Sequence, residues 1–336
     1  MPENPIYILP SQNLGLDLMR ATEAAALAAA RWTGRGDKES GDGAAVDAMR
    51  RVLNTIRMDG TIVIGEGEKD EAPMLGNGEK VGTGEGLKVD IAVDPVDGTR
   101  LLAWGMRNSI AVMAASIGGG MYDPHMCFYM EKLVVGADAA DAVDLDAPIE
   151  ENIRRVAKAK GKRVEDVVVA VLNRERHNEL TAAIRAAGAR TRMFTDGDVA
   201  ASVAAATPGV PIDMLAGVGG SPEGVVTACA MKALGGRILA RLKPSTDEER
   251  ENTLAAGHSL DRVLDTNDLV SSERTLFVAT GITEGDLVRG VRYLEDGSAR
   301  THSIVMRSSS GTVRWIEAHH NLAKVQQFFV EHGNDL

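Results

Sequence analysis

Residues 89–99 read VDIAVDPVDGT, an apolar strand pattern that leads directly into a sharp turn containing two aspartates. Pro95 and Gly98 enforce the turn, so the carboxylates of Asp94 and Asp97 can point into one small volume. Two carboxylates this close repel each other unless they are protonated or bridged by cations. Hard divalent ions such as Mg²⁺ or Mn²⁺ prefer oxygen ligands, so the stretch predicts a metal site at the end of a strand.

Gly98 and Thr99 are expected to open a helix, whose free N–H groups and positive dipole end can hold a phosphate. The hexapeptide DPVDGT thus offers metal ligands, an anion site and a hydroxyl group. The alternative is that Asp-Pro and Asp-Gly merely make a turn. Thr99, the apolar strand before the turn and the GEGE sequence at residues 65–68 favour the functional interpretation.

Three further acidic residues stand at the ends of expected elements. Glu66 directly follows the β-branched run at residues 61–64, and Glu223 begins a helix in GGSPEG. Asp42 stands where a helix N-cap is expected, so it is equally well explained as an ordinary capping residue. Loops at strand ends are where α/β scaffolds mount functional groups, so all three residues are candidate functional groups, and Glu66 can face a metal at the end of its strand.

The hydrophobic pattern predicts an α/β protein of mixed α+β character. Helices are expected at residues 14–32 and after residue 42, and irregular chain is expected between the strand at 109–116 and residue 145. Strands then alternate with helices up to residue 234, which implies crossover connections and a largely parallel core. Strands between residues 275 and 318 look like an antiparallel finish. A change of composition near residue 160 predicts two lobes, residues 1–160 and 161–336.

The composition limits the class of protein. The 336 residues carry a net charge of -11, which argues against a nucleic-acid binder, although metal ions and a few basic residues can still hold an anionic substrate. No apolar run reaches the roughly 20 residues that span a bilayer, and the N-terminal residues do not resemble a signal peptide. Cys127 and Cys229 lie outside any CxxC pattern, so we expect buried free thiols in a reducing, cytoplasmic compartment.

Six dispersed motifs resemble a known family. DPVDGT after a strand resembles the signature of the lithium-sensitive sugar and inositol phosphatase superfamily. More specific are WTGRGDKESGDGAAVDAMR at residues 32–50, GTIVIGEGEKDEAPML at 60–75, FYMEKLVVG at 128–136, TDGDVAASV at 195–203 and GVGGSPEGVV at 217–226. Together, and in this order, they resemble class II fructose-1,6-bisphosphatases over roughly residues 14 to 320.

The resemblance implies a two-lobed sugar-phosphatase fold of layered αβαβα type. It implies hydrolysis of the 1-phosphate of D-fructose 1,6-bisphosphate to fructose 6-phosphate in gluconeogenesis, by direct attack of a metal-activated water. Two or more Mg²⁺ or Mn²⁺ ions are implied, together with a homo-oligomer, either a dimer or a tetramer. The N-terminal lobe would hold most metal ligands, and the C-terminal lobe would hold the sugar-phosphate contacts and Glu223.

The resemblance also implies roles for individual residues. The metal ligands would be Asp42, Glu66, Asp94, Asp97 and Glu223. The catalytic group would consist of Thr99, which positions the attacking water, Asp42, which helps to accept the proton, and Lys38. Substrate contacts would come from Asp97, Gly98, Thr99, Tyr129, Arg174, Glu175, Arg176, Asp196, Gly197, Asp198 and Gly220, with Arg174 and Arg176 anchoring the distal 6-phosphate. His177 is expected to be structural rather than a ligand.

Departures from the family pattern leave alternatives open. Many members have Glu where Asp97 stands, and the usual Lys-Pro-Arg or Arg-Pro-Arg appears here as Arg174-Glu175-Arg176, with a carboxylate between the two guanidiniums. Sedoheptulose-1,7-bisphosphatase activity is the closest alternative. An inositol monophosphatase usually shows Asn-Phe after DPIDGT, whereas Arg100-Leu101 follows here. A non-catalytic phosphate-binding regulator would be expected to lack a ligand or Thr99.

Overall fold

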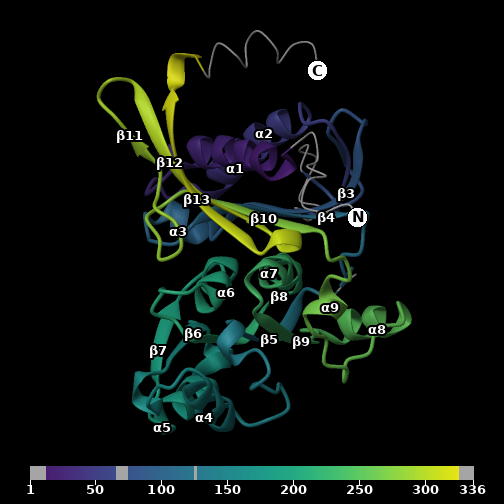
Figure 1. Ribbon diagram of the computed structural model, residues 1–336, viewed down its shortest axis with the longest axis vertical. Coiled ribbons are helices and arrows are strands. Elements are labelled where there is room, and N and C mark those ends of the chain that lie inside the picture. The colour runs from purple at the N-terminus through teal and green to yellow at the C-terminus, as the bar shows by residue number, and fades with distance from the viewer. Residues whose placement is uncertain (1–12, 66–74, 125–126, 325–336) are drawn as a thin grey trace, which may run out of the picture.

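The computed structural model describes residues 13–65, 75–124 and 127–324, which form five layers (Figure 1). Helices α1 (Leu14–Ala30) and α2 (Lys38–Leu53) cover the outer face of an eight-stranded sheet. Helices α6 (Val199–Ala206) and α7 (Ser221–Leu234) lie between this sheet and a second, five-stranded sheet. Helices α4 (Ile149–Ala159) and α5 (Asn178–Ala186) cover the outer face of the second sheet. The αβαβα layering predicted from the sequence is confirmed.

The eight-stranded sheet is built from two distant parts of the chain. Its order is β11-β12-β10-β4-β3-β1-β2, with β13 also paired to β12. Strands β1 and β3 are parallel, and the other neighbours are antiparallel. The strands are β1 (Met58–Ile64), β2 (Lys80–Val81), β3 (Leu87–Asp97), β4 (Ile110–Ile117), β10 (Thr275–Gly281), β11 (Arg292–Tyr293), β12 (Ser298–Arg307) and β13 (Thr312–Asn321). The C-terminal strands that were predicted to be antiparallel therefore belong to the same sheet as the strands of the N-terminal third.

The five-stranded sheet has the order β7-β6-β8-β5-β9. Its strands are β5 (Tyr129–Val135), β6 (Val168–Leu172), β7 (Arg190–Phe194), β8 (Met214–Gly220) and β9 (Arg237–Leu242). Strand β6 is parallel to β7 and to β8, whereas β5 is antiparallel to β8 and to β9. The sheet is therefore mixed, which corrects the prediction of a largely parallel core.

Two strands of this sheet lie where the sequence pattern predicts none. Strand β5 falls in the stretch expected to be irregular, and β9 follows α7 directly. In β5 the charged residues Glu131 and Lys132 interrupt the apolar run, so hydrophobicity alone does not reveal the strand. The predicted boundary near residue 160 falls inside residues 129–242, the segment that forms this sheet.

The central helices are buried on all sides because each sheet presents an apolar face to them. Helix α6 reads VAASVAAA, and both helices consist mainly of small residues, which let the two sheets approach them closely. Cys229 of α7 and Cys127 are buried free thiols, as predicted. Among the described residues, no helix has both the length and the apolar character needed to cross a membrane.

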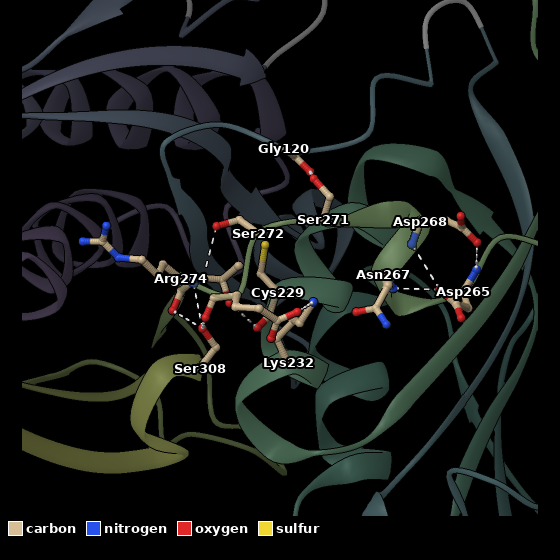
Figure 2. Close-up of polar contacts among 12 residues, drawn as sticks. Gly120, Cys229, Lys232, Asp265, Asn267, Asp268, Ser271, Ser272, Arg274 and Ser308 are labelled. Atoms are coloured by element: carbon tan, nitrogen blue, oxygen red, sulfur yellow. Dashed lines mark hydrogen bonds and ion pairs between the residues drawn. The ribbon is translucent and has the colours of Figure 1, made fainter. Parts of the chain in front are cut away.

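Polar contacts fix the C-terminal half of α7 to the chain just before and within β10 (Figure 2). The Thr275 hydroxyl donates to the Cys229 carbonyl over 3.2 Å, and the Lys232 ammonium lies 2.5 Å from Glu273 Oε1. The nearby helix α9 (Thr266–Leu269) is fixed by a capping box between Asp265 and Asp268. The short helix α8 (Asp247–Ala255) precedes it. These contacts hold in place the helix that carries Glu223 at its other end.

Candidate active site

One cleft of about 650 Å³ brings together nearly all of the predicted site residues. Its walls come from α2, the end of β3, the start of β5, the end of β6, the segment before α6, and the β8–α7 turn. The predicted residues that line it are Asp42, Asp94, Asp97, Gly98, Thr99, Tyr129, Arg174, Arg176, Asp196, Gly197, Asp198, Gly220 and Glu223. Lys38 and Glu175 do not line the cleft, and Glu66 lies outside the described residues.

The DPVDGT segment reaches the cleft through a bulge in β3. The strand does not end at Asp94, as predicted, but runs to Asp97. Asp94 is opposite Val112 and Asp97 is opposite Ile110, so β3 contains one more residue than β4 between these two pairs. Such a bulge bends a strand and redirects its side chains. Gly98 follows with φ of 90°, a conformation that glycine adopts without strain.

The helix after the bulge, α3 (Thr99–Ala103), is short and is tied to the second sheet. Its Arg100 N–H donates to Asp196 Oδ2 over 3.1 Å. Asp196 follows β7, so this bond joins the DPVDGT segment to the far wall of the cleft. At least one of the α3 N–H groups expected to bind phosphate, that of Arg100, therefore already donates to a carboxylate.

The prediction that Asp42 caps α2 is wrong. The helix begins at Lys38, and Asp37 is the N-cap, with its Oδ1 accepting from the Ser40 N–H over 3.0 Å. Asp42 lies inside the helix and faces the cleft, so the capping explanation no longer competes with a functional one. Lys38 is about half exposed and lies 3.4 Å from Glu39, away from the cleft.

Three carboxylates lie close together in the cleft, of which Asp97 and Asp198 are buried and Glu223 is partly buried. Asp97 is 2% exposed, and its pKa is raised well above the usual range, first by burial and then by the charges of Asp198 and Glu223. The pKa of Glu223 is likewise raised by burial and by Asp198. Within the described chain, Asp97 Oδ2, Asp198 Oδ1 and Glu223 Oε2 are buried without a hydrogen-bond partner. Buried carboxylates in this condition call for a counter-charge.

The backbone is shaped around two of these carboxylates. A Cβ atom on Gly219 would lie 1.7 Å from Asp198 Oδ2, and one on Gly220 would lie 1.8 Å from Glu223 Oε2. Any other residue at these two positions would displace an acidic side chain. Gly219 and Gly220 of GVGGSPEG are therefore required by close approach to carboxylates rather than by a nucleotide-binding loop.

The donor chemistry fits hard divalent cations. Carboxylate oxygens are the ligands that Mg²⁺ and Mn²⁺ prefer. A bound cation would give the three unsatisfied oxygens a positive partner. Among the described residues, no group of three or more His, Cys, Asp or Glu side chains is close enough to hold one ion. The predicted ligand Glu66 lies outside these residues. The site therefore suits a divalent cation in two respects: its ligand atoms are carboxylate oxygens, and their negative charge is not balanced.

Lys132 is a functional candidate that sequence reasoning missed. It lies on β5, is 1% exposed, and its Nζ is 2.5 Å from Asp198 Oδ2. The same ammonium donates to the Gly220 carbonyl over 2.8 Å, so it joins a carboxylate to the β8–α7 turn. The available signal was a lysine inside the apolar strand YMEKLVV, where a buried cation needs a partner.

Arginines and a tyrosine form the outer part of the cleft. The Arg174 guanidinium lies 3.3 Å from Asp196 Oδ1, and Arg176 donates to the Val218 carbonyl over 2.9 Å. The Arg176 guanidinium also stands 5.2 Å from the centre of the Tyr129 ring. Glu175 is exposed and, among the described residues, forms no ion pair with either arginine. Glu175 therefore neutralises neither guanidinium, although Arg174 is paired with Asp196.

A family model and two curated relatives match nearly the whole chain. The family model described as bacterial fructose-1,6-bisphosphatase, glpX-encoded, matches residues 12–320. A class 2 fructose-1,6-bisphosphatase of Haemophilus influenzae is 46% identical over 322 residues, covering 92% of this chain and 96% of its own. The fructose-1,6-bisphosphatase 1 class 2 of Escherichia coli is 45% identical over 325 residues, covering 93% and 96%.

Among solved structures, an extragenic suppressor from Pyrococcus furiosus aligns with 15% identity and a TM-score of 0.26. The alignment covers 57% of this chain and 68% of that one. A likeness this weak has no bearing on the fold or the site.

Proposed function

The chain belongs to the family of bacterial, glpX-encoded fructose-1,6-bisphosphatases, and we propose that it hydrolyses the 1-phosphate of D-fructose 1,6-bisphosphate to give fructose 6-phosphate and phosphate. One observation carries the proposal: a single cleft is lined both by carboxylates with buried, unsatisfied oxygens and by two arginines. This arrangement suits a substrate with two phosphates, of which one reacts and one is held.

The proposed cofactors are two or more Mg²⁺ or Mn²⁺ ions. They would be held by Asp42, Glu66, Asp94, Asp97 and Glu223. When bound, such ions neutralise phosphate charge and lower the pKa of water. The unsatisfied buried oxygens of Asp97 and Glu223 support this assignment.

Protein side chains have the remaining roles, which are to orient the attacking water, accept its proton and contact the sugar. The Thr99 hydroxyl, at the end of the β3 bulge, orients the attacking water, and the Asp42 carboxylate accepts its proton. Asp196, Gly197, Asp198 and Gly220 contact the sugar, together with Tyr129. Lys38, which is exposed and outside the cleft, has no direct contact with substrate in this proposal.

The distal phosphate is assigned to Arg174 and Arg176. Charge-assisted hydrogen bonds from guanidinium to phosphate are stronger than neutral ones and fix geometry. Since Glu175 forms no ion pair with these side chains, they can serve as an anchor. This favours a bisphosphate over an inositol monophosphate. A sedoheptulose 1,7-bisphosphate would present the same two charges, so it is tested beside the main substrate.

We also propose that the protein works in the cytoplasm as a homo-oligomer. Trp104 and Trp315 are 64% and 48% exposed, whereas tryptophan is highly buried on average. Sedimentation velocity at micromolar concentration checks the oligomer, and a monomer would contradict it.

Phosphate release from a panel of substrates tests the function. The panel contains fructose 1,6-bisphosphate, sedoheptulose 1,7-bisphosphate, fructose 1-phosphate and inositol 1-phosphate, each with Mg²⁺ and with Mn²⁺. We expect the highest kcat/KM for fructose 1,6-bisphosphate. Asp94→Asn, which removes a charge from the carboxylate site, should be folded and inactive. Preference for a monophosphate would overturn the proposal.

A further inference from the structure

The parallel ladder between β6 and β8 is interrupted at the edge of the cleft. Within the described chain, the last β6–β8 pair is Ala170 with Leu215. Strand β6 nevertheless stays paired with β7 as far as Leu172, and β8 stays paired with β5 as far as Gly220. The two strands therefore separate from each other at their carboxyl ends while each keeps its other neighbour.

The side chain of His177 fills this gap. It is 3% exposed, and its Nδ1 lies 2.7 Å from the Leu172 carbonyl oxygen. Its Nε2 accepts from the Val218 N–H, also over 2.7 Å. The imidazole thus connects the last residue of β6 to β8 by one hydrogen bond at each ring nitrogen.

The alternation of β6 shows that the ring replaces a direct ladder bond. Val167 and Asn173 direct their backbone groups to β7, because the Val167 carbonyl accepts from Arg190 and the Asn173 N–H donates to Phe194. Successive residues of a strand alternate between its two neighbours, so the Leu172 carbonyl points toward β8. In an uninterrupted ladder it would accept from a β8 N–H, whereas here the imidazole stands between the two groups.

The surroundings of the ring are adapted to it. Gly217 has φ of +136°, and a Cβ there would lie 2.9 Å from His177 Nε2. Arg176, the preceding residue, donates to the Val218 carbonyl over 2.9 Å. Both backbone groups of Val218 are therefore held by the segment that contains the two arginines.

We propose that His177 is a positioning residue, whose ring holds the ends of β6 and β8 apart and so sets the spacing between Arg174 and Arg176 on one side of the cleft and Gly219 and Gly220 on the other. The role rests on the proposed function, because it fixes the distance between the anchor for the distal phosphate and the reacting end. It also requires one tautomer. A carbonyl only accepts and a backbone N–H only donates, so Nδ1 bears the hydrogen and Nε2 is bare.

Nuclear magnetic resonance of the wild-type protein with ¹⁵N-labelled histidines tests the bridge without reference to catalysis. The His177 ring is assigned from the signals that disappear in His177→Phe or, if that variant does not fold, in His177→Gln. At pH 7 we expect a neutral ring with a protonated Nδ1 and an unprotonated Nε2. A ring with hydrogen on Nε2 would overturn the proposal.

Kinetics test the positioning. His177→Phe fills the same space but makes neither hydrogen bond, so KM for fructose 1,6-bisphosphate should rise roughly tenfold, with a smaller change in kcat. His177→Gln, whose amide can still accept from Val218, should restore part of the affinity. His319→Phe, at an exposed site on β13, is the matched control and should match wild type.

The outcomes separate the two proposals. Wild-type kinetics in a folded His177→Phe would mean that the ring merely fills space, and a fall in kcat without a change in KM would also contradict the positioning role. If the wild-type protein does not hydrolyse the bisphosphate, the proposed function fails, but the tautomer measurement still decides whether the bridge exists.

Discussion

Burial is the main reason why the pKa values of Asp97 and Glu223 in the cleft are raised. Asp97 and Asp198 are almost removed from solvent, Glu223 is partly buried, and each of the three has a buried oxygen that no described group satisfies. Lys132 offsets part of their charge through Asp198. Divalent cations would offset more of it, and this links the electrostatics of the apoprotein to the proposed chemistry.

Thr99 provides a test of the reacting end. Thr99→Ala should lower kcat strongly with little change in KM, because the hydroxyl acts when water attacks. Thr99→Ser keeps the hydroxyl and should retain much of the activity. Steady-state kinetics on fructose 1,6-bisphosphate measure both variants. Equal inactivity of the two would show that the methyl group is what matters.

Arg176 provides a test of the anchoring end. Arg176→Ala should raise KM for the bisphosphate by roughly ten- to a hundredfold, since a charged hydrogen bond contributes about 1.5–3 kcal/mol. The effect on fructose 1-phosphate should be small, because that substrate lacks the distal group. Arg163→Ala removes an exposed arginine that does not line the cleft and serves as the control. Equal losses on both substrates would contradict the anchor.

Sequence patterns predicted the residues of the site better than their local structure. The Pro and Gly of DPVDGT indicated that Asp94 and Asp97 lie near each other, and both line the cleft. Asp42 looked like an N-cap because Gly41 and Gly43 flank it, yet the N-cap is Asp37, five residues earlier. The roles of Lys132 and His177 depend on partners from β8 or near it, and such contacts do not show in a local pattern.

At the scale of elements, α1 contains a buried ionisable group that makes its packing depend on pH. Glu23 contacts β12 and is 7% exposed to solvent. Burial raises its pKa from 4.5 to about 7. The Thr301 hydroxyl donates to its Oε1 over 3.2 Å. Between these two pH values the folded state binds more protons than the unfolded state, so this group's contribution to stability falls as pH rises.

Glu23→Gln should therefore stabilise the protein at pH 8 by about 2–3 kcal/mol, because the amide has no charge to bury. The gain should shrink as pH falls from 7 and vanish below about 4.5. Denaturant unfolding at several pH values measures it. Glu39→Gln changes an exposed residue of α2 and should have little effect at any pH. A gain that does not depend on pH would contradict the account.

Elements were predictable where apolar residues recur without interruption. Helices α5 and α6 lie in the stretch where strands and helices were predicted to alternate, because both show helical periodicity between clear breaks. Strand β5 was missed because its buried lysine resembles a surface residue, and its antiparallel pairing changes the sheet from parallel to mixed. The pairing partner of a strand is a property of the whole chain rather than of the strand.

At the scale of the molecule, the cleft joins the two sheets, so metal binding should stabilise the fold as a whole. A ligand present at a hundred times its Kd adds about 2.7 kcal/mol to the free energy of unfolding. Thermal unfolding followed by circular dichroism should therefore show a higher Tm with Mn²⁺ or Mg²⁺ and a return to the starting value with chelator. Asp97→Asn should lose this increase without a lower metal-free Tm, because it relieves repulsion. An unchanged wild-type Tm would contradict the metal site.

The product of the reaction tests the central claim most directly. Wild-type protein is incubated with fructose 1,6-bisphosphate and Mn²⁺, and ³¹P nuclear magnetic resonance follows the two phosphate signals. If the carboxylate end of the cleft reacts and the arginine end holds, the 1-phosphate signal should disappear as inorganic phosphate grows, and fructose 6-phosphate should remain. Accumulation of fructose 1-phosphate, or no release at all, would contradict the account.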